Sequence, residues 1–301
     1  MRVGVVGAGG IAVPHVRAWQ ALGAHVVVHS RRPPTEFAER HGTAMAADLA
    51  ELLATSDLVD VCSPTDTHEE VVLAAVAARR PVICEKPLAR TAHGAQSLVD
   101  AARQAGVPLL PAHVVRWFPA YDALRARLST GALGVVDHAH FTRQVQAPPD
   151  DSWFHDVARS GGVVLDLMLH DLDQALWLFG PVREVAARSL DPRQRSVRAV
   201  LAHESGVTTT VEATWGPPGT PFSTTYAVGG SRGTAAYDTT TDDEATDDEF
   251  ADADPYLRQA RELRDHVLTG APARVTADDG VAAVALAERV LERLPLLGPA
   301  G

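Results

Sequence analysis

The sequence is poor in cysteine, in long apolar runs and in positive charge. Only two of its 301 residues are cysteines, Cys62 and Cys84. Both fall in segments that resemble buried strands, and two thiols at this spacing provide neither a disulfide framework nor a metal-ligand pattern. We therefore interpret them as small core residues. No run of about 18 uncharged apolar residues occurs, so no segment is a candidate membrane span.

Basic residues are outnumbered by acidic ones: 27 lysines and arginines stand against 38 aspartates and glutamates, which gives a formal net charge of -11. A nucleic-acid-binding protein needs a basic footprint, so this balance disfavours nucleic acid as a partner. Eight of the acids, and no base, lie in residues 242–254. Clustered like charges repel each other, and we interpret this segment as a solvated loop. The chain enters an apolar strand at once, without a cleavable signal pattern, and we expect a cytoplasmic protein.

The pattern of strands and helices divides the chain into two parts, as its length also suggests. In residues 1–118, short apolar strands alternate with helical segments. Such units predict an α/β Rossmann domain, a doubly wound parallel sheet with right-handed crossovers. The expected strands are Arg2–Val6, His25–His29, Leu58–Cys62, Val82–Cys84 and Leu109–Leu110, and the expected helices are Ile11–Leu22, Pro34–His41, Glu69–Arg79 and Ala92–Ala105.

Residues 119–301 have a different character, with long strands of period-two alternation. They predict an α+β domain with a large, mostly antiparallel open sheet that has one apolar and one polar face. The expected strands are Val135–Gln146, Val182–Leu190, Ser196–His203, Val207–Trp215, Phe222–Val228 and Thr234–Asp238, and the expected helices are Tyr121–Leu128, Tyr256–Leu268 and Asp279–Arg293.

A glycine motif opens the first domain. Residues 3–12 read VGVVGAGGIA, in which a strand is followed by Gly7-x-Gly9-x-x-Ala12 and a helix. Gly7 permits a tight turn, Gly9 lets the backbone approach a pyrophosphate, and Ala12 allows close packing of helix on strand. The start of the helix offers N–H groups to phosphates. We predict a dinucleotide site here rather than a purely structural turn, with further contacts from Gly10 and Ile11.

The end of the second strand bears on the choice of cofactor. An NAD site places an acid about 20 residues after the glycines, but this strand ends His29-Ser30-Arg31-Arg32. Ser30 can donate a hydrogen bond to a 2′-phosphate, and Arg31 or Arg32 can clamp it. We therefore predict NADP, with NAD as the other possibility. The alternative interpretation is that both arginines are ordinary surface charges.

Residues 160–174, SGGVVLDLMLHDLDQ, carry ionisable side chains within an apolar run. In a helix, Asp166, His170 and Asp173 share one face. Buried ionised groups cost several kcal/mol unless they are paired, so we interpret this face as the wall of a reaction site. The alternatives are that His170 is a satisfied core histidine and that Asp173 is a structural partner. Asp166 and His170 supply only two ligands, and we expect no metal.

Further polar residues follow the other predicted strands, at the edge where such sheets bind ligands. They are Ser63, Pro64, Thr65 and His68, then Glu85 and Lys86, then His113 and Arg116. With these segments the chain resembles the glucose-fructose oxidoreductase, inositol dehydrogenase and MocA family over nearly its whole length. The motifs are GAGGIA, SPTDTH, EKPL, HVVRWFP, SGGVVLDLMLHDLD, VGGSRGTAAYD and DPYLRQARELRDHVLTGAP.

The resemblance implies a nicotinamide-dependent oxidoreductase in which Lys86 contacts the reacting oxygen. It implies that His170 is the general acid and base, and that Asp166 binds substrate or orients this histidine. The chemistry of the residues agrees, because histidine exchanges protons near neutral pH and an ammonium stabilises a developing alkoxide. The other implied cofactor contacts are Ser63, Pro64, Thr65, His68 and Glu85.

The chain departs from the family pattern at three points. Thr65 follows Pro64 where the family usually carries asparagine, and Met168 stands where a small residue is frequent. The chain is also short for the family, which suggests trimmed loops in the second domain. These departures bear on the cofactor loop and on the shape of the pocket.

The family acts mostly on sugars, cyclitols and related polyols. We expect a substrate wall on which an apolar ring face stacks while polar groups hold hydroxyls, although tryptophans also serve as core residues. Its candidates are His113, Arg116, Trp117, Tyr121, Trp153, His155 and Arg159.

The leading hypothesis is hydride transfer between NADP and a secondary alcohol or ketone of a carbohydrate-like molecule. The alternatives are a cofactor-retaining glycosidase or elimination enzyme of the same family, and a non-catalytic NADP(H)-binding regulator. By analogy with the family, we expect a homodimer or homotetramer formed through the open sheet.

Overall fold

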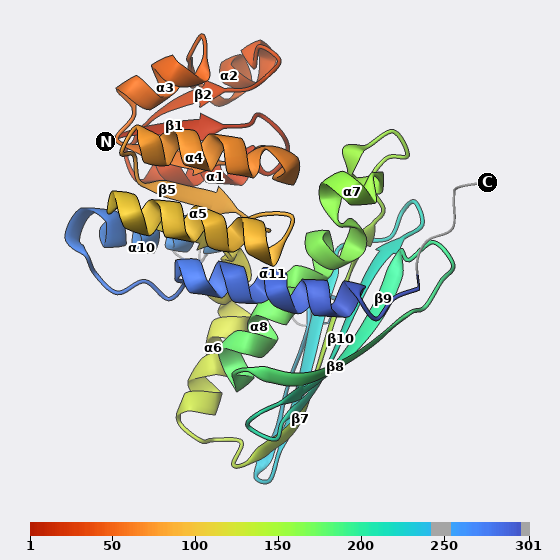
Figure 1. Ribbon diagram of the computed structural model, residues 1–301. Helices are drawn as coiled ribbons and strands as arrows, with labels where there is room; N and C mark the ends of the chain where they lie inside the picture. Colours follow the sequence, from red (N-terminus) through yellow and green to blue (C-terminus); the bar gives the residue numbers. More distant parts are fainter. Residues whose placement is uncertain (242–253, 296–301) are drawn as a thin grey trace. The chain divides into compact units, whose positions relative to one another are not determined.

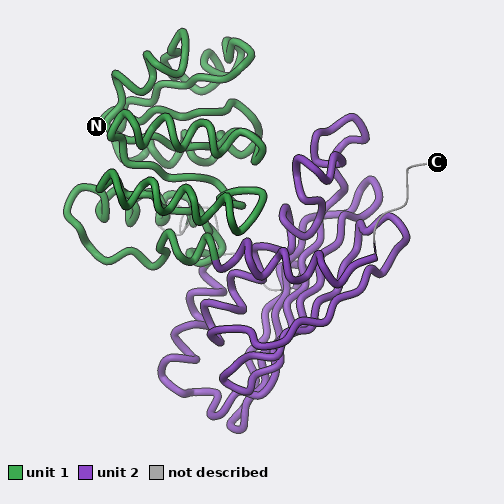
Figure 2. The backbone as a smooth tube through the Cα atoms, in the orientation of Figure 1, with its two compact units in different colours: residues 1–118, 247–281 green, residues 119–246, 282–301 purple. Residues whose placement is uncertain are grey.

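The computed structural model describes residues 1–241 and 254–295. They form two compact units (Figure 2). Unit 1 comprises Met1–Phe118 and the described part of Asp247–Val281. Unit 2 comprises the described part of Pro119–Thr246 and the described residues from Ala282 onward. Residues 254–281 therefore pack in the first unit, whereas the sequence analysis placed them in the second domain. The acidic segment lies outside the described residues except for Asp254.

Unit 1 contains a six-stranded parallel sheet in the order β3-β2-β1-β4-β5-β6. This is the doubly wound order of dinucleotide-binding domains, and it confirms the predicted fold class. The chain leaves β1, β4, β5 and β6 at one common edge of the sheet. The strands are β1 (Arg2–Val6), β2 (His25–His29), β3 (Ala44–Met45), β4 (Leu58–Val61), β5 (Val82–Glu85) and β6 (Leu109–Ala112).

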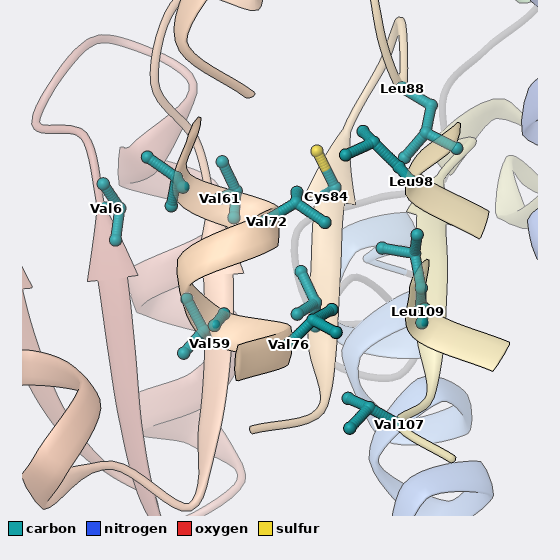
Figure 3. Close-up of a cluster of buried hydrophobic side chains, with 14 of the residues drawn as sticks. Val6, Val59, Val61, Val72, Val76, Cys84, Leu88, Leu98, Val107 and Leu109 are labelled. Atoms are coloured by element: carbon teal, nitrogen blue, oxygen red, sulfur yellow. The ribbon is translucent and has the colours of Figure 1, made fainter. Parts of the chain in front are cut away.

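Helices cover both faces of this sheet, because its strands are apolar on both sides. One core joins the sheet to α3, α4 and α5, and Figure 3 shows it with Val59, Val72 and Leu98 among its side chains. The other core joins the opposite face to α1 and α10 through Trp19 and Leu263. The helices are α1 (Ala12–Ala21), α2 (Thr35–His41), α3 (Leu49–Thr55), α4 (His68–Ala77), α5 (Ala92–Ala105) and α10 (Pro255–Thr269).

Unit 2 contains a six-stranded sheet in the order β12-β11-β7-β10-β9-β8 (Figure 1). Its pairs are antiparallel except for the central β7 and β10, which run parallel. In β10 the odd-numbered residues from Thr209 to Trp215 are buried, as the alternation predicted. The strands are β7 (Val136–Gln146), β8 (Val182–Ser189), β9 (Ser196–His203), β10 (Thr208–Gly216), β11 (Ser223–Gly230) and β12 (Gly233–Asp238).

The helices of unit 2 include a π-helical turn, η4 (Val164–Met168), that leads directly into α8 (Leu169–Phe179). The sequence pattern predicted that Asp166, His170 and Asp173 lie in one helix, but residues 160–174 do not form one regular α-helix. The other helices are α6 (Pro119–Ser129) and α7 (Val157–Ser160), and α11 (Ala277–Leu291) begins in unit 1 and ends in unit 2. Among the described residues no helix combines the length and apolar character needed to cross a membrane.

Candidate active site

The glycine loop joins β1 to α1 in a conformation that requires glycine at its first position. Gly7 has φ +116°, and a Cβ there would lie 2.5 Å from the Cys62 carbonyl oxygen. Gly9 and Gly10 are exposed and a Cβ on either would meet nothing within 4 Å. Helix α1 follows with no side-chain cap on its first turn. The loop is thus an open backbone cradle beside a helix N-terminus, which suits a pyrophosphate.

The end of β2 lies directly beside this cradle, because Gly7 N–H donates to the His29 carbonyl at 2.8 Å. Arg31 and Arg32 are exposed there. The Ser30 hydroxyl donates to the Arg32 carbonyl, which ties the segment into a local turn. No carboxylate occupies this stretch, so it can receive an anion but lacks the acid that binds the ribose 2′-hydroxyl in an NAD site.

The loop after β4 is anchored by His68. The two ring nitrogens of this buried histidine lie 2.9 Å from the Pro87 and Ser63 carbonyl oxygens. Burial lowers its pKa. Thr65 is buried in a single 3₁₀ turn, whereas Ser63 is half-buried. His68 therefore connects the segments that follow β4 and β5.

Lys86 directly follows β5 and is half-buried. It is the only lysine in the sequence, where the other 26 basic residues are arginines. Lysine and arginine are not interchangeable, since lysine presents a compact point charge on a flexible stem. Glu85, the residue before it, is buried. One Glu85 oxygen accepts the Lys86 N–H at 3.0 Å and the other lies 2.9 Å from His15.

Three candidates after β6 lie in the interior of unit 1. His113, Arg116 and Trp117 are each at most 2% exposed. Arg116 pairs with Asp279 at 3.1 Å, and Trp117 Nε1 donates to Glu262 at 3.0 Å. The Arg116 and Trp117 contacts fasten α10 and the start of α11 to the sheet. The structure therefore gives these two side chains a structural role.

In unit 2, the π-helical turn carries Asp166 and is followed by His170 on α8. Both side chains are half-buried. Trp215 Nε1 on β10 donates to Asp166 Oδ2 at 3.1 Å, which fixes the carboxylate against the sheet. π-Helical turns occur frequently at functional sites, and here one sets the direction of Asp166 relative to the helix that bears His170. Trp215 was predicted only as a buried strand residue.

An aromatic group surrounds this tryptophan. His155 and Phe154 lie edge-on to Trp215, with ring centroids 5.8 Å and 6.4 Å away. Trp153 stacks on Phe154 at 4.2 Å, and the Arg159 guanidinium lies 5.8 Å from the Trp153 ring. The predicted substrate candidates Trp153, His155 and Arg159 are thus brought together with Asp166 through Trp215.

Tyr121 and the other acids of α8 lie deeper. Tyr121 is fully buried and its hydroxyl is 2.6 Å from the Thr224 hydroxyl. Arg143 donates to Asp171 through Nε at 2.8 Å and through Nη2 at 2.9 Å. Asp173 is also buried. Tyr121 therefore belongs to a buried polar network next to α8, and it does not line an open surface of unit 2.

The sequence analysis missed Trp215, His15 and Asp60. Two signals were available for the last pair. His15 lies three residues after Ala12, on the helix that follows the glycine loop, and Asp60 is a charged residue in the otherwise apolar strand LVDV. A charge inside a fully buried strand indicates a partner, and His15 is that partner.

The comparison with protein families identifies both halves of the chain. Residues 1–113 match the model described as "Oxidoreductase family, NAD-binding Rossmann fold", and residues 121–236 match the "GFO/IDH/MocA C-terminal domain".

Individual relatives agree with this result. An inositol 2-dehydrogenase of Acidothermus cellulolyticus is 36% identical over 62% of this chain and 56% of its own length. The chain thus spans less than two thirds of that relative. An inositol 2-dehydrogenase of Rhizobium meliloti is 27% identical over 96% of this chain and 95% of its own length.

A solved structure extends the likeness to the whole fold. The structure of GenD2 from gentamicin A biosynthesis, in complex with NAD, has a TM-score of 0.86 and 27% identity over 97% of this chain and 93% of that chain. The glycine cradle, the doubly wound sheet, the second mostly antiparallel sheet and both family matches lead to one conclusion: the chain belongs to the Gfo/Idh/MocA oxidoreductase family.

Proposed function

We propose that this protein is an oxidoreductase that transfers a hydride between a nicotinamide dinucleotide and a secondary alcohol or ketone of a sugar, cyclitol or related polyol. One observation carries the proposal. Lys86, the sole lysine, follows β5 at the same sheet edge at which the open glycine cradle follows β1. Ligands of parallel sheets bind at this edge. Dinucleotide binding belongs to unit 1 and substrate binding to unit 2 in this proposal.

The residues of unit 1 fit a dinucleotide. Gly9 and Gly10 with the start of α1 would hold the pyrophosphate. NADP is the favoured cofactor, since exposed Arg31 and Arg32 replace the acid that an NAD site uses. Ser63, Pro64, Thr65 and Lys86 would lie along the nicotinamide half. GenD2, by contrast, was solved with NAD.

The chemistry requires one proton to move with each hydride. A bound nicotinamide would supply the hydride acceptor for oxidation of the carbinol carbon and the hydride donor for the reverse reduction. In the oxidative direction an imidazole nitrogen of His170 accepts the hydroxyl proton, a role to which histidine is suited near neutral pH. In unit 1, the Lys86 ammonium can stabilise negative charge that develops on a reacting oxygen. Asp166, held by Trp215, binds a substrate hydroxyl or orients His170.

The substrate class follows from unit 2 and from the relatives. Trp153 and the rings around Trp215 provide apolar faces, while Asp166, His155 and Arg159 provide polar groups nearby. This mixture suits a polyol ring, which has an apolar face and a polar rim. The two relatives described above are named inositol 2-dehydrogenases. A cyclitol is therefore the first substrate to test.

Titration of the protein with NADPH and NADH, followed by nucleotide fluorescence, tests the cofactor assignment. We expect tighter binding of NADPH, and an Arg31→Ala variant should lose about 10-fold or more in NADPH affinity while NADH affinity stays constant. Arg103→Ala is the matched control, because Arg103 is exposed near the end of α5, at the opposite sheet edge. Equal binding of both nucleotides by the wild type would overturn the NADP assignment.

A further inference from the structure

His15, Asp60 and Glu85 form a buried ionic cluster inside unit 1. His15 lies on α1, Asp60 in β4 and Glu85 at the end of β5. None of the three is more than 5% exposed. His15 Nδ1 lies 2.8 Å from Asp60 Oδ2, and His15 Nε2 lies 2.9 Å from Glu85 Oε1. The imidazole therefore joins two neighbouring strands at their carboxyl ends.

This geometry requires a doubly protonated ring. Both nitrogens of His15 face carboxylate oxygens, which accept hydrogen bonds, and a neutral imidazole has only one N–H. Burial is the largest single influence and lowers the pKa of His15, but the adjacent Asp60 and Cys62 side chains together raise it by more, so the pKa lies well above its usual value. The imidazolium thus neutralises part of the buried negative charge.

The neighbouring polar groups do not replace this cation. Trp19 Nε1 donates to Asp60 at 2.6 Å, the Cys62 thiol lies 3.6 Å from Asp60, and the Tyr256 ring lies 5.5 Å from the His15 ring. Burial raises the pKa of Cys62 to about 12 and also raises the pKa of Cys84 and Tyr256. These groups stay neutral and leave the charge balance to His15.

A metal ion is the competing explanation for the cluster. The ligand atoms of His15, Asp60 and Cys62 lie within 4.8 Å of one another. A metal would need the thiolate of Cys62 and a deprotonated nitrogen on His15. Both states are opposed here, since the thiol pKa is raised and both imidazole nitrogens are hydrogen-bonded to carboxylates. The observed contacts favour a cluster held together by hydrogen bonds from a protonated His15 to the two carboxylates, without a metal ion.

Glu85 connects this cluster to Lys86. Its Oε1 faces His15, and its Oε2 accepts the backbone N–H of Lys86 at 3.0 Å. Because both oxygens are engaged, the carboxylate has one defined orientation. The peptide that carries the sole lysine is therefore fastened, through one side chain, to an imidazolium in α1.

We propose that His15 is a positioning residue for Lys86 and acts through Glu85; this inference rests on the oxidoreductase function proposed above. The imidazolium holds the Glu85 carboxylate against the Lys86 N–H, which sets the direction in which the lysine side chain leaves β5. Without His15, two buried carboxylates lose their cation and Glu85 turns away from this N–H. A displacement of about 1 Å in a reacting group costs on the order of 10²-fold in rate.

The test compares His15→Gln with the same substitution of a buried histidine in unit 2. His203→Gln is the matched control, because His203 is 1% exposed in unit 2, its ring nitrogens are hydrogen-bonded to the Gly180 carbonyl and the Thr209 hydroxyl, and its ring lies edge-on to Phe179. Each variant is assayed for melting temperature, NADPH affinity, kcat and KM. We expect His15→Gln to lose roughly 10²-fold in kcat, with NADPH affinity within about threefold of wild type. His203→Gln should lose thermal stability but keep its kcat.

A second variant, Glu85→Gln, keeps the proposal testable if His15→Gln does not fold. In Glu85→Gln one of the two carboxylate oxygens becomes an NH₂ donor, so the side chain no longer has acceptors at both positions that face His15 and the Lys86 N–H. By itself it should lose roughly 10²-fold in kcat, and an unchanged kcat would overturn the proposal. Where both single variants fold, the double variant adds a further test. If His15 acts through Glu85, the double variant loses about as much kcat as one single variant. Losses that multiply to about 10⁴-fold would mean independent roles and would overturn the proposal.

The sole lysine also provides a direct readout. Reductive methylation with ¹³C-formaldehyde labels only Lys86 and the terminal amine, so one NMR signal reports the lysine environment. We expect this signal to shift in His15→Gln and to stay unchanged in His203→Gln. An unchanged signal in His15→Gln, or an unchanged kcat, refutes the positioning role. Absence of turnover in the wild type would instead refute the proposed function, and the NMR result would still test the contact.

Discussion

The buried Arg143–Asp171 pair offers the sharpest stability prediction. Two hydrogen bonds of 2.8 Å and 2.9 Å join the side chains, which are 2% and 0% exposed. Asp171→Asn removes the charge and replaces one acceptor by an amide donor, which leaves a buried guanidinium without its counter-ion. Breaking such a pair costs about 3–5 kcal/mol. At about 2–4 °C per kcal/mol for a unit of this size, the melting temperature should fall by roughly 6–20 °C.

Circular dichroism during thermal and urea unfolding measures this loss. Glu184→Gln is the control, because its partner Arg183 and Glu184 itself are 63% and 72% exposed and such a pair contributes about 0–1 kcal/mol. The double variant Arg143→Met with Asp171→Leu removes both charges and should recover most of the stability. If Asp171→Asn lowers the free energy of unfolding by less than about 1 kcal/mol, Arg143 does not depend on Asp171 as its buried counter-ion.

Three further predictions concern unit 1. Gly7→Ala should destabilise the fold by about 1–3 kcal/mol, because Gly7 has φ +116° and a Cβ would lie 2.5 Å from the Cys62 carbonyl, whereas Gly9→Val should keep the melting temperature and weaken dinucleotide binding. The pKa of His15 is raised on folding. The difference in unfolding free energy between wild type and His15→Gln should therefore be largest below about pH 6.5 and shrink as the pH rises toward the native pKa. A difference that grows with pH would contradict this prediction. Iodoacetamide at pH 8 should leave Cys62 unmodified in the native protein, because burial raises its pKa to about 12, and should modify it in urea, as mass spectrometry can show.

The fold class could be predicted because local signals were strong. Arg2–Val6, His25–His29 and Ala92–Ala105 have the bounds that the sequence pattern predicted. The pattern missed β3 and α3, of two and seven residues, because elements this short carry little periodicity. Asp48, which caps α3 by accepting from the Glu51 N–H, was the available signal.

Long-range pairing was harder to predict. The parallel register of β7 and β10 aligns Phe141 with Val211, and alternation along either strand contains no information about that partner. Helix α10 is amphipathic, but its apolar side does not reveal which core it enters. Leu263 packs in the same core as Trp19 of α1, which places α10 in unit 1. Domain membership therefore depended on packing rather than on local pattern.

The contacts of the candidate site residues were also hard to predict from local sequence patterns. The spacing of Asp166 and His170 predicted a shared face of one regular α-helix, but Asp166 lies in a π-helical turn and His170 in the α-helix that follows it. Trp117 and Arg116 fit a substrate wall by residue type, yet their contacts with Glu262 and Asp279 are structural. Residue type alone does not show which partner a side chain has in the folded unit.

The central claim is hydride transfer with His170 as the proton acceptor. The most direct measurement uses myo-inositol and a polyol panel deuterated at the carbinol carbons, with NADP⁺ or NAD⁺, and detects deuterated nicotinamide by mass spectrometry. We predict deuterium in the reduced cofactor for the wild type, and a rate roughly 10²–10⁴-fold lower in His170→Asn with unchanged nucleotide affinity. Reduced cofactor without deuterium, or equal rates in both proteins, would contradict the account.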